Sequence, residues 1–315
     1  MFDFEKDFDL GVIETPKPKQ VEKTKPIIKK AEPFELVKTE ELKTAEPKTA
    51  EQIDWFDQHY YKVGEDFYPS VTTILQAAPF KQQALAYWRG DIGNNEADKQ
   101  FYQAGERGTF IHNCMTKMLN GNRIYFKFVP EGENGLLVTD QWDAIQLHRI
   151  AQFFKVVKPV ILHNELIVYS HKHRFAGSID LVLEIKDGSY LIDGKKPVYL
   201  PSGVYIADLK TSRDIHDDYW LQVAAYTFAF QEMYPDIKIT NNLILHTKSS
   251  NKLGIEGFSC KTVKLYGSEE EIEDNPQAII NENFNAFLDI HKLWKRKPVP
   301  TKPKLFNMPN KISIY

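Results

Sequence analysis

The chain has 315 residues, of which 42% are hydrophobic and 26% charged, and its net charge at pH 7 is −3. This composition is typical of a globular protein, and it gives no global attraction to nucleic acid or membrane. The two cysteines, Cys114 and Cys260, form no CxxC motif, so we expect no disulfide framework, zinc ribbon or iron–sulfur cluster. The acidic N-terminus has no signal-peptide core, and the cysteine usage fits a reducing cytoplasm.

The N-terminal segment, residues 1–52, is predicted to lie outside the globular part. From residue 12 to about 52 it is rich in Lys, Glu, Pro and Thr, a composition that cannot bury enough apolar surface to offset the ordering entropy. Residues 1–11 instead carry three phenylalanines among acids. They are either a frayed terminus or a docking peptide for a protein partner on a flexible tether, and the sequence leaves both interpretations open.

Residues 53–158 are predicted to form a helical lobe. Ser70 precedes the stretch "VTTIL" and belongs to the residue types that cap helix N-termini. Three further stretches have the composition or periodicity of helices, and they end at Gly or just before Pro. These predicted helices cover residues 81–93, 98–121 and 138–157.

Residues 159–298 are predicted to form an α/β core, followed by a basic tail at 299–315. Alternating apolar residues predict strands, and Asp-Gly pairs predict turns between some of them. A mixed central sheet flanked by helices follows from this order of elements. The predicted strands are 160–170, 175–185, 189–193, 198–200, 204–211, 238–247 and 261–267, and the predicted helices are 217–235 and 281–297.

Two acids on predicted strands are the first candidates for chemistry. Asp180 lies in "AGSIDLVLEI", three residues after Gly177, and Asp208 lies in "GVYIADLKTS", two residues before Lys210. Residues at i and i+2 of a strand share a face, so Asp208 and Lys210 share one surface. If the strands are neighbours, the carboxylates converge and favour Mg²⁺ or Mn²⁺, with the Leu209 carbonyl completing the site. The alternative is an ordinary ion pair at a sheet edge.

A second acid-x-lysine pair, Asp193 and Lys195, competes for the same assignment. It surrounds Gly194 at a predicted hairpin turn, which makes it exposed and less suited to catalysis. The helix after "DLKTS" favours the first pair, because Gln222 and Tyr226 share one helical face close behind it. These two side chains hold a phosphate, brace Lys210, or simply meet solvent.

Two further residues are weaker candidates. His112 lies in "GERGTFIHNCM", and Gly105 and Gly108 are expected to lead into a helix start whose amides face an anion. A neutral imidazole there would be a metal ligand, although a lone histidine is more often structural. Glu165, on the strand before Asp180, either binds a second metal or its waters, or is an edge-strand charge.

Taken in order, these motifs resemble the RecB-like branch of the PD-(D/E)XK nucleases, over residues 65–296. "PSVTTIL", "DLKTS" and "LQVAAY" are similar to the group of mitochondrial genome maintenance exonucleases with its bacterial and phage relatives. The resemblance implies a restriction-endonuclease-like core with an added N-terminal helical lobe. It also implies His112, Asp180, Asp208 and the Leu209 carbonyl as metal ligands, and Lys210 as the catalytic lysine.

The resemblance further implies DNA as the partner, single-stranded or with free ends. Some relatives hold an iron–sulfur cluster with four cysteines, which this chain, with two, cannot do. Gln222, Tyr226 and Glu165 would support the site. The expected DNA-binding set has basic side chains beside aromatic stacking platforms. It contains Thr211, Ser212, Arg107, Trp88, Arg89, Arg123, Tyr125, Arg174 and Trp220. The basic C-terminal tail either contacts phosphates or only solvates the end of the last helix.

The expected function is therefore a Mg²⁺- or Mn²⁺-dependent DNA exonuclease in recombination, repair or replication, in the cytoplasm of a bacterial cell and possibly phage-encoded. Two alternatives remain. One is a nuclease-fold binding module that recruits a partner through residues 1–11, and the other is a structure-specific endonuclease. The hairpin at residues 187–202 separates Asp180 from Asp208 and is longer than the resemblance leads us to expect.

Overall fold

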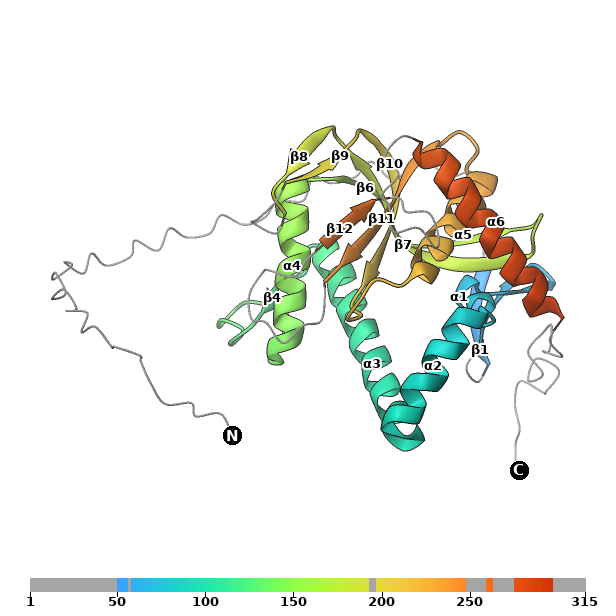
Figure 1. The fold of residues 1–315 in the computed structure, drawn as a ribbon. Helices are drawn as coiled ribbons and strands as arrows, with labels where there is room; N and C mark the ends of the chain where they lie inside the picture. Colours follow the sequence, from blue (N-terminus) through green and yellow to red (C-terminus); the bar gives the residue numbers. More distant parts are fainter. Residues whose placement is uncertain (1–49, 56–57, 193–196, 248–258, 263–274, 297–315) are drawn as a thin grey trace, which may run out of the picture. The chain divides into compact units, whose positions relative to one another are not determined.

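The computed structural model describes residues 50–55, 58–192, 197–247, 259–262 and 275–296, all within one compact unit (Figure 1). In these ranges the chain is mixed α/β, with six helices and several sheets. The predicted N-terminal peptide, the basic tail and the Asp193–Lys195 pair lie outside them. None of the helices described is both long and apolar enough to cross a membrane.

A three-stranded antiparallel sheet opens the described chain. Its strands are β1 (Ala50–Trp55), β2 (Gln58–Val63) and β3 (Asp66–Pro69). The tether predicted up to residue 52 therefore ends earlier, and the segment predicted as a helical lobe begins with strands. Composition misled here, because pairing with β2 supplies the order that the polar sequence of β1 lacks alone. Ser70 caps α1 (Val71–Leu75) as predicted, accepting a hydrogen bond from the Thr73 amide at 3.0 Å.

Three longer helices follow: α2 (Pro79–Ile92), α3 (Asn94–Leu119) and α4 (Gln141–Val157). They match the predicted helices except at one point. Gly105 and Gly108 lie in the interior of α3, so the expected helix start with free amides before His112 is wrong. Helix interiors tolerate glycine at a cost of about 1 kcal/mol each, which allows α3 to continue through both residues. Between α3 and α4 the chain forms a short parallel pair, β4 (Ile124–Tyr125) and β5 (Leu136–Leu137).

The central sheet has five strands in the order β12-β11-β10-β7-β6. Only β10 and β11 are parallel among these neighbours, and α5 (Asp217–Met233) forms the crossover between them. The other neighbouring pairs are antiparallel. The strands are β6 (Val160–Ser170), β7 (Phe175–Ile185), β10 (Gly203–Lys210), β11 (Ile239–His246) and β12 (Ser259–Thr262).

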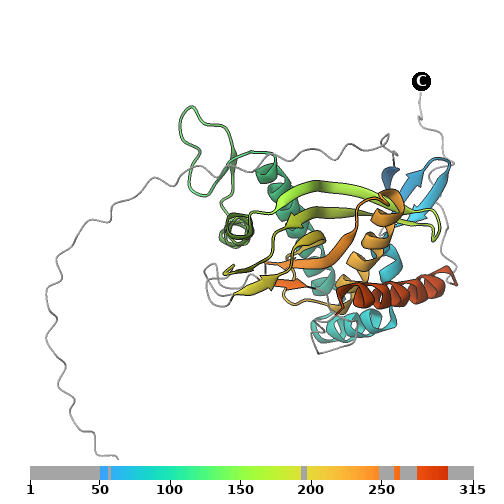
Figure 2. The same cartoon turned by 90° about the horizontal axis from the view of Figure 1, so that it is seen from above.

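Each face of the sheet packs against a different set of helices. Ile206 of β10 packs with α1, α5 and α6 (Pro276–Lys295), whereas Tyr205, Ala207 and Leu209 pack with α3 and α4. This alternation follows the period of two along a strand. Figure 2 shows α6 beside α5 and apart from α4. Residues of β10 are thus buried on both faces, so a charge on this strand needs a specific partner.

The predicted hairpin at residues 187–202 is present. It consists of β8 (Gly188–Tyr190) and β9 (Val198–Leu200), which pair antiparallel. β8 follows the last residue of β7, Ile185, and β9 precedes the first residue of β10, Gly203, which pairs with Ile185. The hairpin is a separate two-stranded sheet, and it follows the end of β7 and precedes the start of β10. Asp208 lies five positions from Gly203, toward the other end of β10.

Candidate active site

Three acids lie in one row across three neighbouring strands. The ladder between β10 and β7 ends at the pair Ala207↔Leu181, which makes Asp208 and Asp180 the next opposed positions. On the other side of β7, Glu165 lies between two residues of β6 that pair with β7, Asn164 and Leu166. In antiparallel register, Glu165 therefore stands opposite Asp180. The sheet brings together three carboxylates that are far apart in the chain.

Glu165 adopts a backbone conformation that is rare for its residue type. Its φ is 56°, in the left-handed region, which costs on the order of 1–3 kcal/mol for a residue with a side chain. The side chain is directed toward α3, where Glu165 Oε1 accepts a hydrogen bond from the Thr116 hydroxyl at 3.2 Å. A conformation of this cost at an acidic position marks a candidate functional residue.

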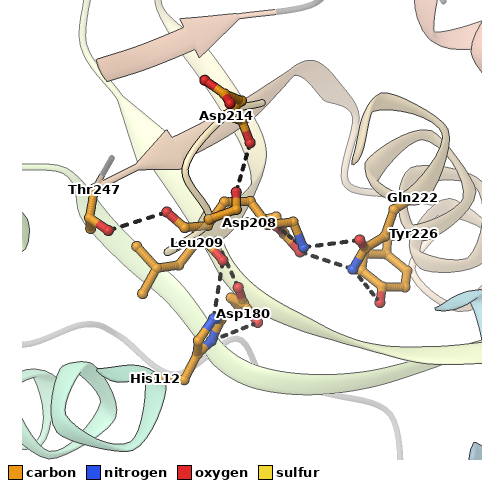
Figure 3. Close-up of polar contacts among 10 residues, drawn as sticks. His112, Asp180, Asp208, Leu209, Asp214, Gln222, Tyr226 and Thr247 are labelled. Atoms are coloured by element: carbon orange, nitrogen blue, oxygen red, sulfur yellow. Dashed lines mark hydrogen bonds and ion pairs between the residues drawn. The ribbon is translucent and has the colours of Figure 1, made fainter. Parts of the chain in front are cut away.

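His112 on α3 completes a cluster of possible metal ligands. One ligand atom from each of His112, Glu165 and Asp180 lies within 4.8 Å of the others. His112 Nδ1 is 3.4 Å from Asp180 Oδ1, and its Nε2 is 3.1 Å from the carbonyl oxygen of Leu209 (Figure 3). The second Asp180 oxygen accepts a 2.7 Å hydrogen bond from the Leu209 amide. Asp180 thereby joins β7 to β10 at the point where the ladder ends.

Asp208 and Lys210 form a second, adjoining network. Lys210 Nζ is 2.7 Å from Asp208 Oδ2 and donates to Gln222 Oε1 at 3.0 Å. Gln222 Nε2 in turn lies 3.1 Å from Asp208 Oδ1 and 3.0 Å from the Tyr226 hydroxyl (Figure 3). The amide of Gln222 therefore holds both members of the ion pair. Gln222 and Tyr226 are buried rather than facing solvent, and Gln222 braces the lysine while Tyr226 accepts a hydrogen bond from Gln222.

The charges of this site are strongly coupled. Burial raises the pKa of Asp208 to about 6, opposed by Lys210 and assisted by Asp180. Burial lowers the pKa of Lys210, but Asp208 and Asp180 outweigh it and hold that pKa above its ordinary value. Burial also lowers the pKa of His112, yet the neighbouring Asp180 carboxylate raises it to about 9. Two cations, on His112 and Lys210, thus lie beside the three carboxylates at neutral pH.

Asp180 itself responds in the opposite direction to Asp208. Burial alone would raise the pKa of Asp180, but His112, Lys210 and the Leu209 amide together lower it below its ordinary value. Asp180 is therefore the carboxylate that keeps its charge most firmly. An anionic oxygen of this kind, next to an imidazole, is the natural anchor for a cation.

The donor set fits a hard divalent cation such as Mg²⁺ or Mn²⁺. It offers carboxylate oxygens from Asp180 and Glu165, the His112 imidazole and the Leu209 carbonyl. Such an ion would replace the proton of His112 as the counter-charge of the acids. Both oxygens of Asp208 instead contact Lys210 and Gln222. The geometry thus favours Glu165, expected as a supporting residue or a ligand of a second metal, in the same compact set as His112 and Asp180.

The expected DNA-binding residues are mostly engaged with other parts of the protein. Arg107 forms ion pairs with Asp143 at 3.0 Å and Asp140 at 3.6 Å, at the start of α4. Trp220 is 2% exposed and belongs to the core, so its expected role as a stacking platform is wrong. The Ser212 hydroxyl donates to the Asp214 carbonyl at 2.8 Å, and Thr211 lies against Gly108 of α3. The remaining arginines form the ion pairs Arg89–Asp98, Arg123–Glu133 and Arg174–Asp66.

Sequence reasoning missed two contributors to the site. Tyr219 lies under the lysine, with Lys210 Nζ 4.6 Å from the centre of its ring, and Thr116 binds Glu165. Both were detectable by helical spacing. Tyr219 precedes Gln222 by three residues, and Thr116 follows His112 by four, so each shares a helical face with a residue already singled out.

Comparisons of the sequence with protein-family models and with curated proteins find no match. The interpretation of this site therefore depends on its geometry and on the order of its motifs.

Proposed function

We propose that the protein is a divalent-metal-dependent deoxyribonuclease of the RecB-like PD-(D/E)XK type. One observation carries the proposal: Glu165, Asp180 and Asp208 lie in one row across three strands, with Lys210 one strand period further and braced by Gln222. A simple ion pair between Asp208 and Lys210 would need neither Asp180 nor Glu165, and it would not need the Gln222 amide that contacts both of its members. Phosphodiester hydrolysis uses all of these groups.

The chemistry assigns separate roles to the two networks. A divalent cation bound by His112, Glu165, Asp180 and the Leu209 carbonyl would supply charge stabilisation and an acidified water. The chain itself provides the Lys210 ammonium, which stays protonated between two carboxylates and can contact a phosphate oxygen as negative charge develops. Asp208 and Gln222 fix the position of that ammonium, because both bind it directly.

The proposed substrate is DNA that is single-stranded or has free ends, cut as an exonuclease in recombination, repair or replication. This part of the proposal is supported by the order of the motifs, and above all by the glutamine–tyrosine helix behind the lysine. The proposed location is the cytoplasm, where Mg²⁺ is abundant. A structure-specific endonuclease would use the same site, so the choice of substrate must separate the two activities.

The test uses linear single-stranded DNA labelled at either end, with a closed single-stranded circle alongside and Mg²⁺ or Mn²⁺ present. The wild type should degrade the linear strands and spare the circle. Asp208→Ala and Lys210→Ala should each lower the rate by about 10²–10⁴-fold, because the first removes the carboxylate that fixes the ammonium and the second removes the ammonium itself. DNA binding in Ca²⁺ should persist in both variants.

Lys292→Ala is the matched control, since Lys292 forms a 2.8 Å ion pair with Asp289 on the exposed side of α6. It should cut at the wild-type rate. Cleavage of the closed circle would show that the protein is an endonuclease rather than an exonuclease. Unimpaired cleavage by both Asp208→Ala and Lys210→Ala would overturn the proposed function.

A further inference from the structure

Helix α4 buries two polar side chains in an otherwise apolar face. Gln146 is 2% exposed and Arg149 is 1% exposed, among Leu147, Ile150 and Phe153 of the same helix. Burying a guanidinium or an amide is costly unless its hydrogen bonds are satisfied, and leucine in either place would avoid that cost. These two side chains therefore need a reason beyond the packing of α4 against the sheet.

Both side chains converge on Thr247, the residue that follows β11. Gln146 Oε1 accepts a 2.7 Å hydrogen bond from the Thr247 hydroxyl, and Arg149 Nη1 donates to the Thr247 carbonyl at 2.5 Å. Thr247 is itself completely buried. A helix more than ninety residues earlier in the chain therefore fixes both the side chain and the main chain of Thr247.

Thr247 in turn holds the main chain of Lys210. The Thr247 amide donates to the Lys210 carbonyl at 2.9 Å, and the Thr247 hydroxyl lies 3.3 Å from the same oxygen (Figure 3). The preceding residue, His246, is 3% exposed, and its Nε2 lies 2.9 Å from the Ser212 carbonyl. The end of β11 thus contacts the chain at Lys210 and again two residues later. Lys210 is the last residue of β10, where strand pairing alone gives the least support.

We propose that Thr247 is a positioning residue for Lys210, held in place by Gln146 and Arg149 of α4. The inference rests on the proposed function and deepens it. It says that the position of the Lys210 ammonium depends on a series of hydrogen bonds made by residues outside the proposed ligand set. A lysine ammonium ends a side chain with four rotatable bonds, so its position depends on a fixed main chain as well as on Asp208 and Gln222. A misplacement of about 1 Å in a catalytic group can cost up to 10²-fold in rate.

The experiment compares Thr247→Val with Thr227→Val in the full chain. Thr227 on α5 is an equally buried threonine whose hydroxyl also contacts a side-chain amide oxygen at 2.7 Å, that of Asn242, and its other hydrogen bond goes to the Val223 carbonyl of its own helix. Both variants lose one hydroxyl and one buried hydrogen bond to an amide. We expect Thr247→Val to lower kcat about tenfold with KM unchanged, Thr227→Val to retain the wild-type kcat, and Thr247→Ser to restore it.

A second readout does not depend on activity. Deuterium uptake by peptides covering residues 208–213 should become faster in Thr247→Val and stay as in the wild type in Thr227→Val. Equal uptake and equal kcat in the two valine variants would overturn the inference. If the wild type cuts no DNA while uptake separates the variants, the proposed function fails and the contact between Thr247 and the Lys210 segment stands.

Discussion

Gly177 on β7 is the residue where side-chain volume is most restricted near the site. A Cβ at this position would lie 2.3 Å from Cε1 of Tyr226, whose hydroxyl accepts a hydrogen bond from the side-chain amide of Gln222. Gly177→Ala should therefore push the Tyr226 ring and, through it, the amide that holds Lys210. We expect a loss of about 1–3 kcal/mol in the free energy of unfolding, measured in urea, together with a lower cleavage rate.

Gly105→Ala is the control for this prediction. Gly105 lies in the interior of α3, and an added Cβ would meet no atom within 4 Å. Alanine is favoured over glycine in a helix by about 1 kcal/mol, so this variant should gain stability and keep its activity. A Gly177→Ala protein as stable as the wild type would contradict the packing of Tyr226 against β7.

Some contacts between individual site residues could be predicted from the sequence, and others could not. The i, i+2 spacing of Asp208 and Lys210 was sufficient to predict that they share a face of the strand. The i, i+4 spacing of Gln222 and Tyr226 was sufficient to predict that these two side chains lie side by side on the helix. The place of Glu165 beside His112 and Asp180 was not predictable. Its place opposite Asp180 depends on the register of β6 and on a left-handed backbone angle, neither of which periodicity encodes.

At the scale of elements, α6 carries a buried histidine in an aromatic cluster. His291 is 2% exposed, and its ring lies near those of Phe175, Phe287 and Trp294. Burial, with Lys295 and His173 nearby, lowers the pKa of His291 to about 4. The folded protein therefore holds this imidazole neutral at a pH where the unfolded chain would protonate it.

The contribution of His291 to the free energy of unfolding should fall as the pH drops from 6.5 toward 4. In that window the unfolded chain binds a proton at His291 that the folded chain does not, so unfolding becomes more favourable by up to about 3 kcal/mol. His291→Phe should remove this contribution, which urea unfolding at several pH values between 4 and 7 measures. Parallel stability curves for the two proteins would refute the prediction.

The elements themselves were largely predictable where they are long and periodic. Helices α3, α4, α5 and α6 and strands β6, β7 and β10 match their predicted segments to within a few residues. The sheet formed by β1, β2 and β3 was missed because the stability of each short strand comes from its neighbour rather than from its own pattern. The two glycines of α3 led to the wrong prediction of a helix start before His112. Glycine is a local helix breaker, but the residues on both sides continue the helix through it.

At the scale of the whole molecule, cation binding should be linked to folding. The ligand set comes from α3, β6, β7 and β10, and these elements meet only in the folded chain. A ligand that binds only the folded state at 100 times its Kd stabilises that state by about 2.7 kcal/mol. Mn²⁺ at such a concentration should therefore raise the Tm of the wild type, as followed by thermal unfolding with and without the ion.

Asp180→Asn should lose most of this rise, because it removes the acid that contacts both His112 and the Leu209 amide. Asp289→Asn on the exposed side of α6 is the control and should respond to Mn²⁺ like the wild type. An Asp180→Asn protein that Mn²⁺ stabilises as strongly as the wild type would show that the ion binds elsewhere.

The position of β10 in the middle of the sheet has a consequence for a chain that is still being synthesised. A nascent chain that ends at residue 200 already contains Glu165 and Asp180, but it has neither Asp208 nor Lys210. Even once β10 has left the ribosome, its parallel neighbour β11 and Thr247 are still to come. Under the proposed function, products that end before Thr247 should not cut DNA, because they lack the strand and the threonine that support Lys210.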